Sequence, residues 1–243
     1  MSKKYLGFDK ATQKTFEQTL KNPLHKLTHK AVLLAVLIFI TSLIVLAVHW
    51  PALSAKAITF DDEQYFVSNP LVQNPGWNSA KRFLLEVLRP STVKGYYQPL
   101  TMISLMADRI FGARNDNLMP LHRTSLILHI ANTALIVILL YLLFGNVWAA
   151  AGAGLLFGLH PMTVESIAWI GERKTLLASF FSLWSLILYI LYTKEKRGKL
   201  FAGAIVMYVL ALMSKPTSTP LPLLMPKAAR SRIAKQLLSP PLF

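Results

Sequence analysis

The chain contains several uncharged apolar stretches that are long enough to cross a lipid bilayer. The first runs from Ala31 to Trp50, twenty residues with no formal charge apart from a proton that His49 could bind. As a helix it would be about 30 Å long, which matches the apolar thickness of a bilayer. A cleaved signal peptide is the alternative, because small residues follow at Ala52, Ser54 and Ala55. The preceding polar region is long, however, and the apolar core exceeds signal-peptide length, so we predict an uncleaved anchor.

The overall composition also indicates a membrane protein rather than a soluble domain. Of the 243 residues, 53% are hydrophobic and only 15% are charged, and the mean hydropathy is +0.44. The formal net charge is +15, but Lys and Arg gather at the ends of apolar stretches, where they orient membrane spans. We therefore predict no nucleic-acid partner. The chain has no cysteine, which excludes disulfides, thiolate metal sites and a cysteine nucleophile.

The apolar stretches predict an all-α, multi-spanning membrane helix bundle with about five spanning or partly spanning helices. The expected spans are 31–50, 126–144, 147–160, 175–192 and 200–213. Together they make one transmembrane domain, 31–225, between a basic arm, 1–30, and a basic tail, 226–243, of aberrant character. The third span covers only about 20 Å, and we interpret its Gly154 and Gly158 as positions of close helix packing.

Loop charges predict how the bundle lies in the membrane. The N-terminal arm and the basic loop after the fourth span should both be cytoplasmic, which gives an integral, multi-pass protein with a cytoplasmic N-terminus. We expect it in a bacterial inner membrane. Five crossings leave the basic tail on the outer side, against the charge bias, unless residues 217–226 re-enter the membrane.

The loop between the first two spans, 51–120, is expected outside and should carry two amphipathic helices that lie on the membrane surface. The first would be capped by Asn78 or Ser79. Its apolar stripe is Ala80, Phe83, Leu84, Val87 and Leu88. The second would run from Pro99 to Phe111. Its stripe is Leu100, Ile103, Met106, Ala107 and Ile110. Packing into a small extramembrane lobe is a compatible alternative.

Two polar segments are candidates for chemistry on the outer face. Asp61, Asp62 and Glu63 are adjacent carboxylates that repel one another, which makes them receptive to a cation or to the proton of a substrate hydroxyl. A solvated acidic turn has the same pattern. The second segment, 160–174, places Glu165, Trp169 and Glu172 on one helical face, followed by Arg173 and Lys174. It would suit a phosphate-bearing sugar substrate, and it would equally suit an interfacial loop with an anchoring Trp.

The histidines carry weaker signals. His129 and Asn132 lie one turn apart inside the second span, where hydrogen bonding between helices is a better interpretation than a transport path. His160 lies at the membrane edge beside the outer loop. The chain has no HExxH, GxSxG or P-loop pattern, so a zinc protease, a serine hydrolase and a phosphorylating ATPase are not indicated.

The order of several short motifs resembles a known family, the tetratricopeptide-repeat-containing O-mannosyltransferase-like proteins of the GT-C class. Residues 60–65, Phe-Asp-Asp-Glu-Gln-Tyr with Asn-Pro at 69–70, look like the acidic motif of the family's first loop. Residues 96–100, Tyr-Tyr-Gln-Pro-Leu, are similar to a Tyr-x-Pro-Leu element in which Gln98 stands where Arg is usual. The resemblance continues through His129–Asn132, Leu159–Ile170, Arg173–Lys174 and Leu212–Pro216.

The resemblance implies transfer of a mannose-like sugar from a polyprenyl-phosphate carrier to a hydroxyl of a protein or glycan acceptor, on the outer face of the bilayer. Asp61 or Asp62 would be the catalytic base, and Arg173 and Lys174 would neutralise the leaving phosphate. Glu165, His160 and Trp169 would help to bind substrate. This chemistry requires no cofactor, although a divalent metal at the carboxylates is compatible with it. Family members usually continue into further helices and repeats, so a truncated, non-catalytic membrane protein is the alternative.

Overall fold

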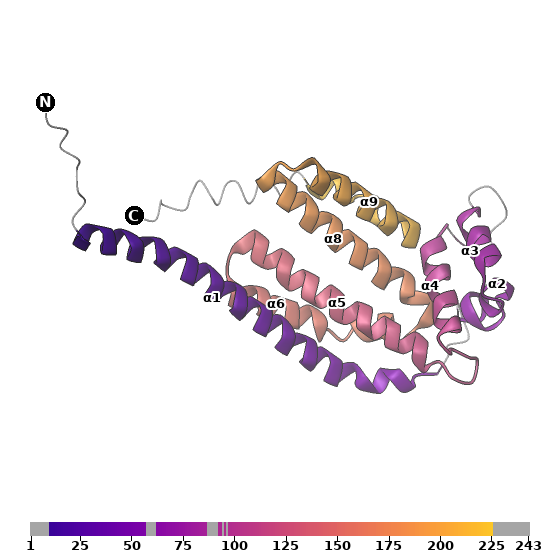
Figure 1. Ribbon diagram of the computed structural model, residues 1–243. Coiled ribbons are helices and arrows are strands. Elements are labelled where there is room, and N and C mark those ends of the chain that lie inside the picture. Colours follow the sequence, from indigo (N-terminus) through magenta and orange to yellow (C-terminus); the bar gives the residue numbers. More distant parts are fainter. Residues whose placement is uncertain (1–9, 57–61, 87–91, 94, 96, 226–243) are drawn as a thin grey trace, which may run out of the picture.

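Figure 1 shows the protein as a computed structural model that describes residues 10–56, 62–86, 92–93, 95 and 97–225, with side chains from residue 29 onward. The described residues form helices and no β-strand. In chain order the helices are α1 (Lys10–His49), η1 (Trp50–Ser54), η2 (Glu63–Val67), α2 (Pro70–Gln73), α3 (Trp77–Leu84), α4 (Pro99–Ile110), α5 (Met119–Phe144), α6 (Val147–Gly158), α7 (Thr163–Ala168), η3 (Ile170–Glu172), α8 (Arg173–Glu195), α9 (Gly198–Ser214) and η4 (Pro216–Ser218).

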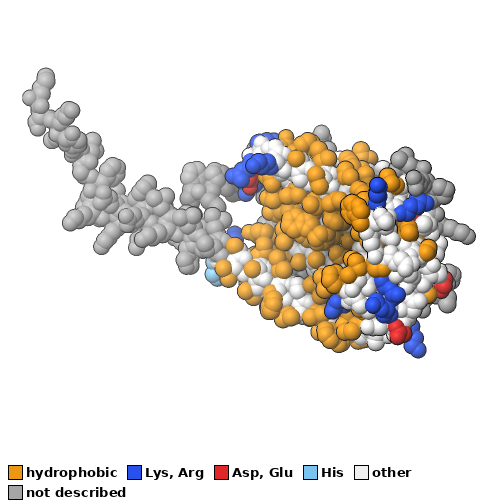
Figure 2. Space-filling model, turned by 45° about the vertical axis from the view of Figure 1, so that its right-hand side comes forward, with side chains coloured by type: hydrophobic (Ala, Val, Ile, Leu, Met, Phe, Trp, Pro, Cys, Tyr) orange, Lys and Arg blue, Asp and Glu red, His pale blue; other side chains and the backbone are white. Residues whose placement is uncertain are grey.

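Five helices, α1, α5, α6, α8 and α9, form an elongated bundle, and α2, α3 and α4 form a lobe at one end of it (Figure 1). Three segments are long and apolar enough to cross a membrane: His29–Ser54, Met119–Phe144 and Ile170–Glu195, while α6 and α9 are shorter apolar helices. On the face in Figure 2, apolar side chains cover the bundle, and Lys and Arg gather toward its ends. The predicted all-α membrane bundle is confirmed.

The short helix α6 packs closely against its neighbours through its glycines. A Cβ atom at Gly158 would lie 2.6 Å from Cγ2 of Val45 on α1, and one at Gly154 would collide with Cγ2 of Val137 on α5. Neither collision could be relieved by a long flexible side chain, so larger residues are excluded at both positions. The interpretation of these glycines as packing positions is confirmed.

Buried polar side chains also join the helices of the bundle. The Nε2 atoms of His49 and His129 lie 2.9 Å and 3.0 Å from the carbonyl oxygen of Gly158, so one oxygen connects α1, α5 and α6. One turn along α5, Asn132 donates from Nδ2 to the carbonyl oxygen of Leu176 on α8 at 3.0 Å. His129 and Asn132 therefore hydrogen-bond between helices, as the sequence indicated.

The lobe packs around its own apolar core. The core residues are Tyr65, Phe66, Val72, Phe83, Val93, Met102, Leu105, Met106, Ala113, Leu121 and Ile170. The predicted start of the first lobe helix is wrong, because α3 begins at Trp77 after Gly76 and no side chain caps it. Ser79 instead donates from its hydroxyl to the carbonyl oxygen of Asn74 at 2.8 Å. Its predicted stripe residues 87 and 88 lie outside the described residues.

The second lobe helix forms where it was predicted, but it buries a different face. In α4 the buried residues are Pro99, Thr101, Met102, Leu105, Met106 and Asp108, whereas Ile110 of the predicted stripe is 61% exposed. The reason is that α4 does not lie on a flat surface: it packs against α2, α3, α5, α8 and α9. Contacts on several sides select the buried face.

The segment that follows α9 turns back toward the bundle instead of leaving it. The hydroxyls of Ser218 and Ser182 on α8 lie 3.0 Å apart, and Tyr208 on α9 donates to the carbonyl oxygen of Thr219 at 3.2 Å. Residues 221–225 form another helical turn, and Leu221 is buried. The described part of the segment expected to re-enter therefore runs back beside α8 and α9.

Candidate functional site

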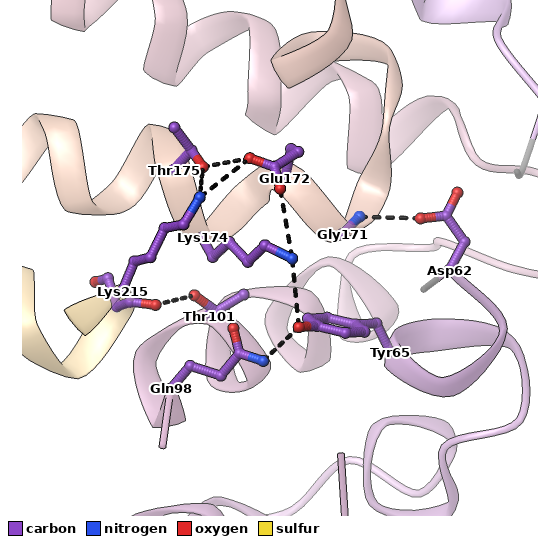
Figure 3. A network of polar contacts seen from close by, with 10 residues as sticks. Asp62, Tyr65, Gln98, Thr101, Gly171, Glu172, Lys174, Thr175 and Lys215 are labelled. Atoms are coloured by element: carbon purple, nitrogen blue, oxygen red, sulfur yellow. Dashed lines mark hydrogen bonds and ion pairs between the residues drawn. The ribbon is translucent and has the colours of Figure 1, made fainter. Parts of the chain in front are cut away.

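The candidate site lies where the lobe meets the bundle, around the η3–α8 junction (Figure 3). Ile170 at the start of η3 is part of the lobe core, which fixes this junction against η2 and α4. A backbone break just before it sets the geometry: Trp169 has ψ of 118°, so α7 ends and the chain restarts as η3. The predicted continuous face of Glu165, Trp169 and Glu172 is therefore wrong, because no single helix carries all three.

Asp62 anchors the first loop to this junction. Its side chain is fully buried, and its Oδ1 accepts a hydrogen bond from the backbone N–H of Gly171 at 2.9 Å. This contact joins two segments that lie 109 positions apart in the sequence. Asp61, the other predicted base, lies outside the described residues, and Glu63 is exposed at the start of η2.

Lys174 points from the first turn of α8 into a polar and aromatic surrounding. Its Nζ lies 3.4 Å from Oε1 of Glu172 and 3.5 Å from the hydroxyl of Tyr65. The same ammonium lies over the rings of Tyr65 and Trp169, 5.0 Å and 5.9 Å from their centroids. Aromatic faces attract a cation, and here they hold a lysine that is 6% exposed.

A second lysine reaches the same carboxylate from the far side. Lys215 follows α9, and its Nζ lies 3.5 Å from Oε2 of Glu172 and 2.7 Å from Oγ1 of Thr175, to which it donates. The Thr175 hydroxyl in turn donates to Oε2 of Glu172. Glu172 thus stands between two ammonium groups (Figure 3). The only sequence signal for Lys215 was its place in the Leu212–Pro216 motif.

Arg173, one residue away, has a different environment. It is fully buried, and its Nη1 lies 2.8 Å from Oδ2 of Asp108 on α4. Its remaining donors bind Ser125 Oγ at 3.1 Å, Ser104 Oγ at 2.9 Å and the Leu121 carbonyl oxygen at 2.5 Å. This guanidinium therefore joins α8 to α4 and α5, whereas Lys174 faces the site.

Two buried polar atoms near the lysines have no hydrogen-bond partner among the described residues: Oε1 of Gln98 and Nε1 of Trp169. Gln98 is 3% exposed, and its Nε2 donates to the Tyr65 hydroxyl at 2.5 Å. A buried polar group without a partner costs about 1–3 kcal/mol, so such atoms commonly have a ligand or water to bind. One acceptor and one donor are thus available beside the lysines.

The residue before Gln98 helps to hold this segment. Tyr97 donates from its hydroxyl to the carbonyl oxygen of Leu84 at 2.9 Å. Burial, and to a lesser extent the charge of Glu86, raises the pKa of the Tyr97 phenol, so the hydroxyl keeps the proton that this bond needs.

Protein O-mannosyl-transferase TMTC2 of Homo sapiens is 30% identical over 154 residues, which cover 62% of this chain and 18% of the human protein. The Xenopus laevis protein of that name is 30% identical over 133 residues, 54% of this chain and 16% of the relative. The Drosophila melanogaster protein O-mannosyl-transferase Tmtc2 is 30% identical over 114 residues, which cover 46% of this chain and 12% of the relative.

The chain is similar to protein O-mannosyl-transferases. The predicted resemblance is therefore confirmed, for a chain that spans less than a fifth of the length of these relatives. No family model matches it, and no solved structure matches it.

The motifs that carry the resemblance to O-mannosyl-transferases converge in the structure. Asp62 and Tyr65 from the first motif, Gln98 from the second, Lys174 from the outer loop and Lys215 from the last motif all belong to the network in Figure 3. They come from four separate segments of the sequence. Convergence of sequence-distant polar side chains at one end of a membrane bundle is the arrangement expected of a functional site.

His160 and Glu165 lie outside this network. His160 is exposed, and its Nδ1 accepts from the backbone N–H of Met162 at 3.3 Å, which stabilises the turn into α7. Glu165 is exposed in α7, and its side chain has no hydrogen bond or ion pair within the described part of the chain. Their predicted roles in substrate binding stay predictions. No group of three or more His, Asp or Glu that could hold a metal occurs among the described residues.

Proposed function

We propose that this membrane protein acts in glycosyl transfer of the GT-C type, moving a mannose-like sugar from a polyprenyl-phosphate carrier to an acceptor hydroxyl at the lobe end of the bundle. The observation that carries the proposal is the meeting of Asp62 with Lys174 and Lys215 around the η3–α8 junction. Similarity to proteins named O-mannosyl-transferases supports the choice of sugar.

The reaction needs a base, and a first-loop carboxylate supplies it. Asp61 or Asp62 takes the proton of the acceptor hydroxyl while that oxygen attacks the anomeric carbon of the sugar. The bond between this carbon and the phosphate oxygen breaks, its electron pair leaves with the carrier phosphate, and the configuration at the anomeric carbon is inverted. The Gly171–Asp62 hydrogen bond supports this role by keeping the loop beside the lysines.

The departing phosphate needs positive charge, and we assign that role to Lys174 and Lys215. Both ammonium groups now face the Glu172 carboxylate, at 3.4 Å and 3.5 Å. A phosphate oxygen could replace that carboxylate between them, where buried cations stabilise the growing negative charge strongly. Arg173 acts in this scheme as a positioning residue, since its donors already bind Asp108, two serines and a carbonyl.

The sugar would complete the hydrogen bonds that the protein leaves open. Oε1 of Gln98 can accept from a sugar hydroxyl, and Nε1 of Trp169 can donate to one. The aromatic rings of Tyr65 and Trp169 beside Lys174 offer apolar faces for the sugar ring. Together these groups would hold the anomeric carbon between the base and the lysines.

We also propose that the lobe lies on the non-cytoplasmic side of the membrane. The basic loop between α8 and α9 lies at the opposite end of the bundle from the lobe. Basic loops are retained on the cytoplasmic side of a membrane, so the lobe would face the other side. The assignment to a bacterial inner membrane stays a prediction, since the relatives reported above are animal proteins.

The test is transfer by the purified protein in lipid nanodiscs, with polyprenyl-phosphate mannose as donor and a serine- and threonine-containing peptide as acceptor. Asp62→Asn keeps an oxygen that can accept from Gly171, so the fold should survive while transfer falls by about a hundredfold or more. Lys174→Ala and Lys215→Ala should each lower transfer at least about tenfold. Lys199→Ala, at the far end of the bundle, is the control.

Three results would contradict the proposal. One is transfer by Asp62→Asn and Asp61→Asn at the rate of the unsubstituted protein. Another is an equal loss of transfer in Lys199→Ala and in the two site lysine variants. The third is the absence of transfer by the unsubstituted protein with every polyprenyl-phosphate sugar offered.

A further inference from the structure

An open groove of about 730 Å³ lies at the lobe end of the bundle, between η1 and the loop that leads into α5. One wall is apolar and includes Trp50, Leu53 and Met119. The other wall is polar and includes Asn115 and Asp116, with Lys56 at its edge. The groove is separate from the network around Glu172, with which it shares no residue.

The groove lies beside two segments that are long and apolar enough to cross a membrane, which would place it at the membrane surface. The apolar segments His29–Ser54 and Met119–Phe144 both end beside it. Trp50 and Met119 are 57% and 50% exposed there, and Trp is a residue that favours the boundary between lipid and water. A molecule bound in this groove is therefore in the headgroup layer, with hydrocarbon on one side and water on the other.

The charged side chains around the groove have no partner among the residues that the structure describes. Lys56 and Asp116 are exposed, and neither has a hydrogen bond or ion pair from its side chain within the described residues. Arg123 lies one turn beyond Met119 on the same face of α5, and it is likewise exposed and unpaired there. One cation and one carboxylate thus line the groove, and a second cation lies one helical turn along α5 from it.

The face of α5 below the groove continues into the lipid-facing surface. Met119, Arg123 and Ile127 follow one another at helical spacing, and all three are exposed. A ligand with a charged head and long apolar chains can place its head in the groove and its chains along this face. An acceptor peptide would have no use for the apolar continuation.

The walls are fixed before any ligand arrives. Backbone hydrogen bonds between Arg114 and Asn117, at 2.9 Å and 3.0 Å, close the turn that presents Asp116. Nε2 of His122 lies 3.0 Å from the carbonyl oxygen of Ala55, which connects the start of α5 to the chain just after η1. Binding to a preformed site costs less free energy, because fewer groups have to be ordered.

We propose that this groove is a binding site for a phospholipid whose phosphate is followed by an ammonium group, as in phosphatidylethanolamine. Lys56 and Arg123 bind the phosphate, and Asp116 accepts from the ammonium group. The acyl chains lie along α5 from Met119 to Ile127, with Trp50 at the level of the glycerol. This site does not depend on the proposed glycosyl transfer.

Native mass spectrometry of the protein, released from nanodiscs with equal parts phosphatidylethanolamine, phosphatidylcholine and phosphatidylglycerol, tests the site. The protein should retain one phosphatidylethanolamine in preference to the other two lipids. Lys56→Ala and Arg123→Ala should reduce that retention by about tenfold, as expected for loss of a charge-assisted contact. Asp116→Asn should abolish the preference over phosphatidylglycerol. All three side chains are exposed and have no partner within the described part of the chain, so the variants should fold normally.

Lys81→Ala, an exposed lysine on α3 of the lobe, is the matched control and should retain the lipid. Equal retention by all variants, or no retained lipid in the unsubstituted protein, would overturn the assignment. Binding of a serine-containing peptide that Lys56→Ala removes, without any lipid retained, would assign the groove to an acceptor instead.

Discussion

Among single residues in the candidate site, Glu172 is the one that contacts both lysines. Its carboxylate contacts Lys174 on one side and Lys215 with Thr175 on the other. The three charged side chains are 16%, 8% and 20% exposed, so water contributes little to their solvation. The contacts of Glu172 with two shielded ammonium groups should therefore contribute to the stability of this junction.

Glu172→Gln should lower the stability of the protein and increase its response to a phosphate ligand. Loss of the carboxylate leaves two shielded ammonium groups without this partner, at a cost of about 1–3 kcal/mol in the free energy of unfolding. Thermal unfolding in detergent measures the loss. Polyprenyl phosphate should then raise the midpoint of the variant more than that of the unsubstituted protein, because the phosphate no longer competes with a carboxylate.

Glu195→Gln is the control, since Glu195 pairs with Arg197 on the surface and such pairs contribute little. A midpoint for Glu172→Gln equal to that of this control, with no gain from polyprenyl phosphate, would refute the role given to Glu172.

Arg173 and Lys174 show what the sequence can and cannot predict about single residues. The sequence identified both cations, because paired cations near carboxylates at a membrane edge suggest phosphate binding. The sequence could not show that the two side chains have different partners. Neighbouring side chains on a helix point about 100° apart, and the sequence does not show which direction faces the core. Asp108, Ser104 and Ser125, which lie far away in the sequence, decide that Arg173 joins α8 to α4 and α5, whereas Lys174 faces the site.

Among the helices, α6 shows how a short apolar segment can belong to a membrane bundle. With only the stretch from Val147 to Gly158, it buries Ala150, Ala151, Gly154 and Gly158 against its neighbours and leaves Leu156 76% exposed. Close approach at the glycines increases dispersion contacts, which are the main source of helix association in lipid.

Gly158→Ala should destabilise the bundle, because the added methyl group meets Val45 at 2.6 Å and Thr133 at 3.0 Å. Overpacking of this kind costs about 1–3 kcal/mol in the free energy of unfolding. Gly152→Ala is the matched control on the same helix, since a Cβ there meets nothing within 4 Å. It should be neutral or stabilising by up to about 1 kcal/mol through helix propensity.

Denaturant titration in mixed micelles compares the two variants directly. If Gly158→Ala proved as stable as Gly152→Ala, close packing at Gly158 would not contribute to the bundle.

The helix α4 shows what a helix-level pattern cannot predict. Its limits were read correctly, because Pro99 favours the first turn and an apolar periodicity follows. The buried face was not predicted correctly, because two polar residues on it are buried by contacts with other helices. Thr101 donates to the Ser214 carbonyl oxygen, and Asp108 forms an ion pair with Arg173. Polar residues that are paired across a tertiary contact look like surface residues in the sequence.

For the whole molecule, the arrangement of helices places the lobe and the α8–α9 loop at opposite ends of the bundle (Figure 1). The three long apolar helices could be predicted because about twenty apolar residues in succession have few alternatives to crossing a bilayer. The joining of lobe and bundle could not, because it depends on single contacts such as those of Asp62 and Ile170 across long sequence distances.

Lys81→Cys and Lys199→Cys should be labelled from opposite sides of the membrane. Both lysines are exposed, the first in the lobe and the second at the start of α9, and the chain contains no other cysteine. In sealed vesicles, a membrane-impermeant maleimide added outside should modify only one of the two variants. Permeabilisation should then allow the other to react. Labelling of both variants in intact vesicles would exclude the topology.

The Gly158 carbonyl oxygen that binds both His49 and His129 has a consequence for biosynthesis. His49 lies at the end of α1, and Gly158, whose carbonyl oxygen it contacts, is made 109 residues later. At about 5–20 residues per second, α1 waits for roughly 5 to 20 seconds before it can bind its partner. During that interval α1 lacks the contact between His49 and the Gly158 carbonyl oxygen. Because α1 is made before α5 and α6, its packing against this pair can be completed only after both have been synthesised.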